Sequence, residues 1–328
     1  MDRELNWAFI GTGTIANQMA TAFSDAGRRI LGVTGRSYSK AESFALKYGV
    51  GKVYCGVDDL CADPEVDIVY IATPNNTHYG QIKQCLEAGK HVIAEKAITL
   101  NISELKQLSR IATERGLILV EAQTIYHMPL YKKLKRMSDI GELGKARIIT
   151  ANFGSFKNYD PNNRFFNMEL GGGALLDIGV YALSAVRLFL DSDPSNVFSV
   201  MVPAQSGTDD LSAIALATET GQVATVALSM HSKQPKRIMV SFEKAYVEIP
   251  DYPRADTAYI TDAQTGETRQ LTAGERSKAL IYEIEDMERA VRTGDASAML
   301  FGHTLSVMDT MTAIRKEWGL EYPEEKNG

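Results

Sequence analysis

The chain has 328 residues, of which 45% are hydrophobic and 23% are charged, a composition typical of a soluble globular protein of about two domains and unlike that of disordered or fibrous chains. With a net charge of −6, the chain lacks the excess of basic residues that is typical of nucleic-acid-binding proteins, and binding to anionic membrane surfaces is disfavoured. The three cysteines form no C-x-x-C pair, the N-terminus is too charged for a secretion signal, and no apolar run approaches the ~18 residues of a membrane span, so we expect a cytoplasmic, reduced protein with no metal, membrane or nucleic-acid partner.

The first 122 residues alternate short apolar runs with stretches of helical spacing, which indicates βαβ units and a doubly wound parallel sheet. Three of the expected helices are followed by a glycine, as is typical of helix C-caps: Gly49, Gly89 and Gly116. The expected strands are Trp7–Ile10, Ile30–Val33, Val66–Ala72, His91–Ala94 and Leu117–Val120. The expected helices are Ile15–Ala26, Lys40–Tyr48, Thr77–Ala88 and Ile102–Arg115.

The second part of the chain has a different pattern, with alternating runs that suit a large, mostly antiparallel sheet with one open face. The expected strands are Val197–Val202, Leu211–Thr218, Val223–Met230, Arg237–Phe242, Tyr246–Ile249 and Ala258–Ile260. The expected helices are Leu175–Leu190, Lys278–Arg292 and Thr304–Glu317. We predict an α/β domain over residues 1–123 and an α+β domain over residues 124–328. The polar stretch Lys157–Asn167 is expected to be a functional loop.

A glycine-rich segment follows the first expected strand and opens the first expected helix. Its sequence is Gly11-Thr12-Gly13-Thr14-Ile15-Ala16, and G-x-G-x-x-A in this context predicts a dinucleotide-binding loop. Gly11 permits the tight turn, Gly13 lets backbone amides approach a pyrophosphate, and the helix N-terminus favours the anion. A tight turn without a ligand is the alternative. The residues expected to contact the cofactor are Gly11, Thr12, Gly13, Thr14 and Ile15.

The end of the second expected strand bears on the choice of dinucleotide. An NAD site usually has an acidic residue about 20 residues after the glycines, for the ribose hydroxyls. This chain instead reads Thr34-Gly35-Arg36-Ser37, and Arg36 with Ser37 can bind the 2′-phosphate of NADP. An ordinary solvated charge is the alternative for Arg36. NADP is therefore the predicted cofactor, with NAD as the alternative.

Ligands of doubly wound sheets bind outside the carboxyl ends of the strands. In this chain polar or conformationally permissive segments follow the apolar runs, which predicts a site assembled from segments far apart in sequence. These segments are Gly11, Arg36, Thr73-Pro74-Asn75, Glu95-Lys96 and Gln123.

Three motifs resemble the Gfo/Idh/MocA oxidoreductase family: Ala72–His78, Ala94–Lys96 and Gly171–Tyr181. The last is similar to the dimeric dihydrodiol dehydrogenase and D-xylose dehydrogenase branch. The resemblance implies a Rossmann domain, an α+β domain with a large open sheet, a bound NAD(P), and hydride transfer at a hydroxyl or carbonyl carbon of a sugar or cyclic polyol. Two residues depart from the family pattern, because Ala97 replaces the proline after the lysine and Tyr181 stands where a histidine is common.

Hydride transfer at a carbinol carbon requires a group that takes or gives the hydroxyl proton. Lys96 is expected beside the nicotinamide, where it can hydrogen-bond the reacting oxygen, with Glu95 orienting it or contacting the ribose. Asp177 and Tyr181 are i and i+4 on a helix and share a face, so Tyr181 is a candidate proton donor or acceptor and Asp177 its positioning partner. The alternatives are a surface ammonium, a helix N-terminal carboxylate and a core ring.

Three further residues are weaker candidates. His78 is expected to face the nicotinamide, the alternative being a helix-start histidine without a ligand. Asn163 and Arg164 are expected to bind substrate hydroxyls, the alternative being a solvated loop. The other histidines considered have no metal-ligand spacing and are interpreted as structural: His127, His231 and His303.

These observations together predict a dehydrogenase or reductase, NADP-preferring, that acts on a sugar, anhydrosugar, cyclic polyol or dihydrodiol. A non-catalytic NAD(P)-binding regulator or sensor is the alternative, although it need not keep Lys96, Asp177 and Tyr181. An NAD-dependent glycosidase is a third reading, which Arg36 disfavours. A homodimer through the open sheet of the second domain is also predicted, on a stripe of small, uncharged residues: Val223, Thr225, Ala227 and Ser229.

Overall fold

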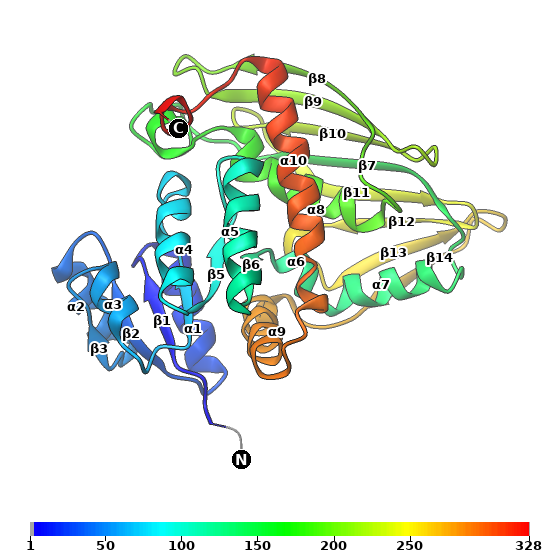
Figure 1. Ribbon diagram of the computed structural model, residues 1–328. Helices are drawn as coiled ribbons and strands as arrows, with labels where there is room; N and C mark the ends of the chain where they lie inside the picture. Colours follow the sequence, from blue (N-terminus) through cyan, green and yellow to red (C-terminus); the bar gives the residue numbers. More distant parts are fainter. Residues whose placement is uncertain (1–2, 328) are drawn as a thin grey trace. The chain divides into compact units, whose positions relative to one another are not determined.

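The computed structural model describes residues 3–327, which separate into two compact units (Figure 1). Unit 1 comprises Met1–Gln123 with Leu280–Phe301, and unit 2 comprises Thr124–Ala279 with Gly302–Gly328. The predicted second domain, 124–328, differs from this division, because Leu280–Phe301 packs in unit 1. The reason is the apolar face of this segment, which is buried in the core of unit 1 through Leu280, Ile284, Met287, Ala290 and Met299.

Unit 1 is built on a six-stranded sheet of order β3-β2-β1-β4-β5-β6, and all its neighbouring strands are parallel. The strands are β1 (Trp7–Ile10), β2 (Ile30–Thr34), β3 (Lys52–Val53), β4 (Ile68–Ile71), β5 (His91–Glu95) and β6 (Leu119–Ala122). This confirms the predicted doubly wound sheet. The chain reverses its direction of winding between β1 and β4, which is where such sheets bind ligands.

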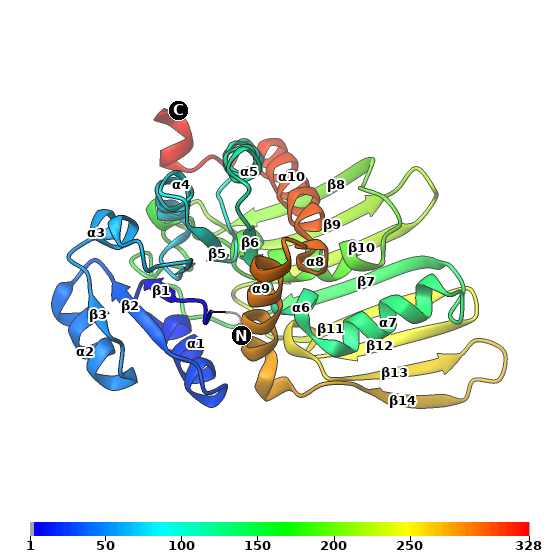
Figure 2. The same cartoon turned by 60° about the horizontal axis from the view of Figure 1, so that its bottom comes forward.

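Helices cover both faces of this sheet. They are α1 (Thr14–Asp25), α2 (Tyr38–Tyr48), α3 (Val57–Ala62), α4 (His78–Glu87), α5 (Ile102–Arg115) and α9 (Ala279–Thr293). Helices α1, α2 and α9 share one apolar core with the sheet, and Figure 2 shows α4 and α5 on the opposite face from α1. In that core the ring of Phe23 packs edge-to-face against Trp7 and Phe9, with centroid distances of 5.1 and 5.3 Å.

Unit 2 contains an eight-stranded sheet of order β14-β13-β12-β11-β7-β10-β9-β8. Its strands are β7 (Ala146–Gly154), β8 (Asn196–Pro203), β9 (Asp209–Ala217), β10 (Val223–Ser229), β11 (Gln234–Phe242), β12 (Ala245–Pro250), β13 (Thr257–Asp262) and β14 (Thr268–Thr272). Only β7 and β10 pair in parallel, which confirms a mostly antiparallel sheet. The central strand β7 and the edge strand β14 were not predicted.

The helices of unit 2 are α6 (Thr124–His127), α7 (Pro129–Asp139), α8 (Val180–Phe189) and α10 (Phe301–Trp318). A π-helical turn over Leu175–Gly179 precedes α8, and α8 packs on β7, β10 and β11. Contrary to the expectation from apolar runs, the segment Met168–Phe189 is long and apolar enough to cross a membrane by composition. However, 83% of its most apolar window is buried inside the protein, which is the burial of a core helix.

The other face of the eight-stranded sheet is open. Its most exposed apolar side chains are those of Phe198, Val200 and Val202 on β8 and Ile148 on β7. Within the predicted stripe on β10, Val223, Thr225 and Ala227 keep at least partial exposure. Ser229 alternates onto the same face of β10. It is buried at the end of the strand, where its hydroxyl contacts Ser232 in the following turn, so it adds no exposed surface to the stripe.

Candidate functional site

The loop between β1 and α1 has the shape of an anion-binding turn. Gly11 has φ +112°, and a Cβ at this position would overlap the carbonyl oxygen of Ala72, so only glycine fits. Gly13 is exposed, and no atom lies within 4 Å of where its Cβ would be. Helix α1 begins at Thr14 without a side-chain cap, which leaves its first amides to a ligand. This open cradle fits the pyrophosphate of a dinucleotide.

Asn17 braces the loop from the first turn of α1. Its Nδ2 donates to the carbonyl oxygens of Thr12 and Gly13, at 3.1 and 2.9 Å, and its Oδ1 accepts from the Tyr48 hydroxyl at 2.9 Å. A hollow of about 590 Å³ beside the loop is lined by Thr12, Gly13, Thr14, Asn17, Gln18, Thr21 and Tyr48. Asn17 and Tyr48 were not predicted, since no local pattern signals that they meet. Ile15 is half-buried on the same turn.

The end of β2 presents a free cation. The Arg36 side chain is exposed and makes no ion pair or hydrogen bond with another residue of the described chain, 3–327. Ser37 caps α2, because its Oγ accepts from the backbone N–H of Lys40 at 3.4 Å. With no acidic side chain between Thr34 and Ala41, this strand end is suited to a phosphate rather than to ribose hydroxyls.

His78 is fully buried at the start of α4, which favours a supporting role over the predicted contact with the nicotinamide. Its Nε2 lies 2.9 Å from the carbonyl oxygen of Thr73, and its Nδ1 lies 3.1 Å from that of Ala97. Burial lowers the pKa of the imidazole, and the carbonyl contacts oppose that effect. His78 therefore ties the loop after β4 to the loop after β5. Thr73, Pro74 and Asn75 keep partial exposure at the carboxyl end of β4.

Glu95 and Lys96 stand at the carboxyl end of β5. The Glu95 carboxylate is buried, accepts from the Tyr70 hydroxyl at 2.6 Å, and accepts from the backbone N–H of Lys96 at 3.3 Å. The peptide bond between Lys96 and Ala97 is cis, and the Lys96 side chain is half-buried. Tyr70, on the neighbouring strand β4, was not predicted as a site residue, although its hydroxyl contacts Glu95.

Gln123 ends unit 1 and is fully buried. Its backbone N–H donates to the carbonyl oxygen of Glu121 at 2.8 Å, and the Glu121 carboxylate accepts from the backbone N–H of Ile98 at 3.1 Å. The end of β6 thus supports the loop that follows Lys96. The burial of Gln123 favours this supporting role over the direct cofactor contact that its place at a strand end predicts.

In unit 2 the candidate residues gather at one end of the eight-stranded sheet. Because β7 and β10 are parallel and their neighbours antiparallel, β7 and β10 end where β9 and β11 begin. The turn that leads into α8 lies on this end, where Leu228 of β10 packs against Gly179. Asp177 accepts from Arg164 Nη1 at 3.2 Å. The half-buried Tyr181 ring lies 6.2 Å from the ring of Phe153, centroid to centroid.

The triple-glycine loop before this turn is held by Asp209, a residue that was not predicted. Gly173 has φ +123°, and a Cβ there would overlap Oδ1 of Asp209. The other carboxylate oxygen accepts from the backbone N–H of Leu175 at 2.6 Å. Burial raises the pKa of Asp209 to about 6. This carboxylate therefore fixes the start of the helical segment that carries Asp177 and Tyr181.

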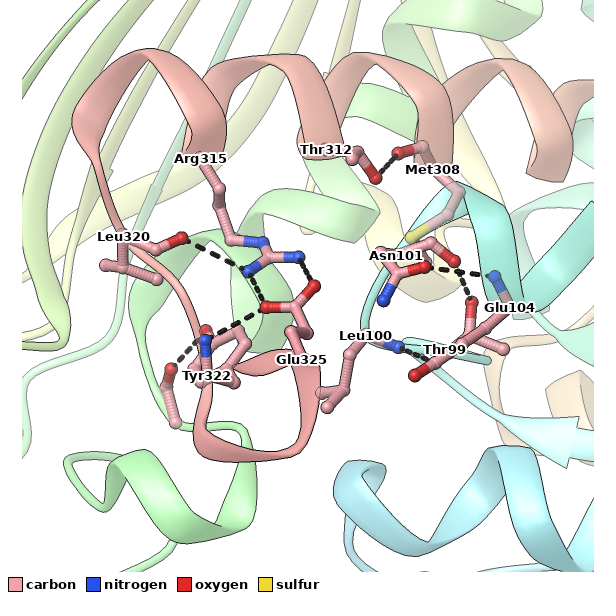
Figure 3. Close-up of polar contacts among 11 residues, drawn as sticks. Thr99, Leu100, Asn101, Glu104, Met308, Thr312, Arg315, Leu320, Tyr322 and Glu325 are labelled. Atoms are coloured by element: carbon pink, nitrogen blue, oxygen red, sulfur yellow. Dashed lines mark hydrogen bonds and ion pairs between the residues drawn. The ribbon is translucent and has the colours of Figure 1, made fainter. Parts of the chain in front are cut away.

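The C-terminal segment also contacts this loop. The Tyr322 hydroxyl donates to the carbonyl oxygen of Gly172 at 2.6 Å. Figure 3 shows Tyr322 beside the ion pair between Arg315 and Glu325, in which two guanidinium nitrogens each lie 2.8 Å from a carboxylate oxygen. Such a bidentate pair fixes the geometry of both partners, so the glycine loop is supported from α10 as well as from β9.

The polar loop over Lys157–Asn167 has no helix or strand. Asn163 is engaged within the loop, because its Oδ1 accepts from the backbone N–H of Phe165 at 3.3 Å, whereas Arg164 reaches Asp177. His231, interpreted from the sequence as structural, makes contacts within the protein: its Nδ1 lies 2.5 Å from Asp210 Oδ2, and its ring stacks on that of Phe166 at 5.1 Å. Within the described residues, no group of three His, Cys, Asp or Glu side chains could hold a metal ion.

Comparisons with known proteins address the identity of the chain. The model of the oxidoreductase family with an NAD-binding Rossmann fold (GFO/IDH/MocA) matches residues 5–123, and the model of the GFO/IDH/MocA C-terminal domain matches residues 131–248. An uncharacterized oxidoreductase of Rhizobium meliloti, ORF334, is 28% identical over 325 residues, which cover 95% of this chain and 96% of that protein.

Two further proteins are similar over their full length. The trans-1,2-dihydrobenzene-1,2-diol dehydrogenase of Mus musculus is 26% identical over 333 residues, covering 98% of this chain and 99% of that protein. The 3-ketoreductase KijD10 of Actinomadura kijaniata, solved with NADP and TDP-benzene, is 25% identical with a TM-score of 0.84, covering 96% of this chain and 98% of that one. Since the two family models between them match both units, the chain belongs to the Gfo/Idh/MocA oxidoreductase family, with an NAD-binding Rossmann domain followed by the family's C-terminal domain.

Proposed function

We propose that the chain is an NADP-dependent dehydrogenase or reductase that transfers a hydride at a CH–OH or carbonyl carbon of a sugar, anhydrosugar, cyclic polyol or dihydrodiol. The observation that carries this proposal is the pair Glu95 and Lys96 at the carboxyl end of β5, with Glu95 held by the Tyr70 hydroxyl at 2.6 Å. The substrate range is supported by the similarity to a dihydrodiol dehydrogenase and a 3-ketoreductase.

The proposed cofactor site combines four strand ends of unit 1, those of β1, β2, β4 and β5. The backbone from Gly11 to Ile15 would hold the pyrophosphate, and Arg36 with Ser37 the 2′-phosphate. The partly exposed residues after β4 (Thr73, Pro74 and Asn75) would flank the nicotinamide ribose. The buried Glu95 and the half-buried Lys96 at the end of β5 would lie beside it. The bound nicotinamide supplies the hydride donor or acceptor. The preference for NADP over NAD is supported by the exposed, unpaired Arg36 and by the lack of an acid beside it.

Proton transfer is assigned to the candidate residues of the family motifs. Lys96 would hold the reacting oxygen of the substrate by a charge-assisted hydrogen bond. The hydroxyl of Tyr181 would give or take the proton. Asp177, which Arg164 contacts at 3.2 Å, would position the helix turn and, with Arg164 and Asn163, bind further hydroxyls of the substrate.

Steady-state assays test this function on pentoses, hexoses, anhydrosugars, cyclic polyols and dihydrodiols, each with NADP and NAD in both redox states. We expect turnover, followed by the absorbance of reduced nicotinamide. Lys96→Met should slow the chemical step by about 10²–10⁴-fold and leave cofactor affinity nearly unchanged. Tyr181→Phe assigns the proton, because a large loss with an altered pH profile makes Tyr181 the acid–base group. Full turnover by Lys96→Met would refute the mechanism, and cofactor binding without any turnover would favour a regulator.

We also infer that the chain forms a homodimer through the open face of the eight-stranded sheet. Phe198 and Val200 are 68% and 69% exposed there, and a contiguous apolar surface of this kind suits sheet-to-sheet association about a two-fold axis. A cytoplasmic location remains part of the proposal, supported by the free thiols of Cys55, Cys61 and Cys85.

A further inference from the structure

Unpaired lysines gather at the end of the eight-stranded sheet where Tyr181 lies. Lys236 is on β11, and its Nζ lies 4.8 Å from the centroid of the Phe153 ring. That ring is 6.2 Å from the ring of Tyr181, so the ammonium is within about 11 Å of the Tyr181 ring. Lys157 follows β7, and its Nζ lies 4.6 Å from the Phe165 ring. Lys233 lies in the turn between β10 and β11.

Three acidic side chains at this end of the sheet have basic partners, whereas Asp160 accepts from Asn162 and the buried Asp209 accepts from the backbone N–H of Leu175. Asp177 is paired with Arg164, Asp210 with His231, and Asp251 with Arg276. In contrast, Lys157, Lys233 and Lys236 make no ion pair with any residue of the described chain, 3–327. Three ammonium groups without an ion-pair partner therefore lie at the end of the sheet where Tyr181 lies, in a protein whose net charge is −6.

Among these three lysines, Lys236 has the environment that most disfavours a charged ammonium. Burial lowers its pKa, the charge of Asp251 opposes that effect, and the charges of Arg276, Lys233 and Lys157 add to it. A half-buried ammonium among other cations is unfavourable for the free protein. An anion placed between Lys236 and Lys157 would relieve the repulsion and form charge-assisted hydrogen bonds.

We propose that the substrate carries an anionic group, a phosphate ester or a carboxylate, that Lys236 and Lys157 bind while its carbinol carbon is presented to Tyr181. The upper bound of about 11 Å between Lys236 and the Tyr181 ring suits a single sugar ring that bears such a substituent. This inference rests on the proposed function, because it names the substrate class of the same site.

Matched ligands separate charge from sugar recognition. The probes are glucose, glucose 6-phosphate, glucuronate and UDP-glucose, and their binding to the full-length protein, with and without NADP, is measured by titration calorimetry. We expect at least one anionic probe to bind about ten- to hundredfold more tightly than glucose, with an affinity that falls as salt rises. The phosphate and carboxylate arms show which anionic group the site prefers.

Three variants assign the effect to this site. Lys236→Gln and Lys157→Gln should each weaken the anionic probe about tenfold or more and leave glucose unaffected. Lys133→Gln, at an exposed lysine of α7, makes the same change of net charge elsewhere and should alter neither. The inference is overturned if no anionic probe binds more tightly than glucose, or if Lys133→Gln weakens binding as much. Lysine-dependent binding of an anionic probe without turnover would refute the proposed function but leave the anion site standing. Turnover of neutral sugars alone would support the proposed function and refute the anion site.

Discussion

Replacement of Asp209 by asparagine should stabilise the protein at neutral pH. The Asp209 carboxylate is fully buried, and its pKa is raised from 3.8 to about 6. A folded-state pKa above the unfolded value means that the stabilising contribution is fully present below about pH 4 and is lost as the pH rises through about 6. The difference between these two pKa values corresponds to about 3 kcal/mol. At pH 8 the ionised carboxylate lowers the free energy of unfolding by this amount.

An asparagine side chain in place of Asp209 would keep an oxygen for the backbone N–H of Leu175, now bound at 2.6 Å, and would carry no charge. We therefore expect Asp209→Asn to raise the free energy of unfolding by up to about 3 kcal/mol at pH 8, and by about half as much at pH 5. For a unit of this size that is an increase of about 6–12 °C in melting temperature, measured by circular dichroism or calorimetry across pH 5–8.

Asp309→Asn is the matched control, because it makes the same change of charge at an exposed position on α10, and we expect it to leave the melting temperature nearly unchanged. A stability difference for Asp209→Asn that does not change with pH would refute the reasoning. So would a variant that is less stable than the wild type at pH 8, because the ionised carboxylate would then be stabilising the helix start that it contacts.

Three other predictions concern unit 1 and the open sheet. Arg36→Ala should weaken NADP about ten- to hundredfold, the usual value of a charge-assisted phosphate contact, and NAD much less; equal losses in a fluorescence titration would mean that Arg36 only stacks on adenine. Gly11→Ala should lower the melting temperature, since the new Cβ would overlap Ala72. Gly13→Ala should fold normally and lose affinity for both cofactors. A normal melting temperature for Gly11→Ala would contradict the steric argument. Light scattering at micromolar concentration should give a dimer mass, and Phe198→Glu a monomer mass; a monomeric wild type would exclude the sheet interface.

Local sequence chemistry was sufficient to predict the doubly wound sheet of unit 1 apart from its two-residue edge strand β3, Lys52–Val53. The tight turn at Gly11 and the apolar run before it are neighbours in the chain, so their pattern carries the geometry. The family motifs around Lys96 and Tyr181 were recognisable for the same reason. The central strand β7 was not predicted, because its residues alternate only partly between apolar and polar and its neighbours β10 and β11 lie far along the sequence.

The supports of the site depend on contacts between distant residues, and these leave no local signal. Gly173 must be a glycine because Asp209 lies against it, and the Tyr322 hydroxyl binds the carbonyl of Gly172 from 150 residues away. The burial of His78 between two loops has the same cause, since Thr73 and Ala97 belong to different strand ends. Residue type and spacing predict candidate site residues such as His78. Only the fold shows whether a candidate faces a ligand or holds a loop in place.

The packing of α9 in the core of unit 1 has a consequence for how the protein is made. A ribosome that has completed Gln123 still has to synthesise the roughly 150 residues of Thr124–Ala279 before the rest of unit 1 appears, which takes about 8–30 s. During that time the core that contains Trp7 and Phe23 lacks the side chains that α9 contributes to it, among them Ile284 and Met287. A fragment ending at Gln123 would keep that surface permanently uncovered, so we expect unit 1 to be obtained as a stable domain only when the α9 segment is supplied.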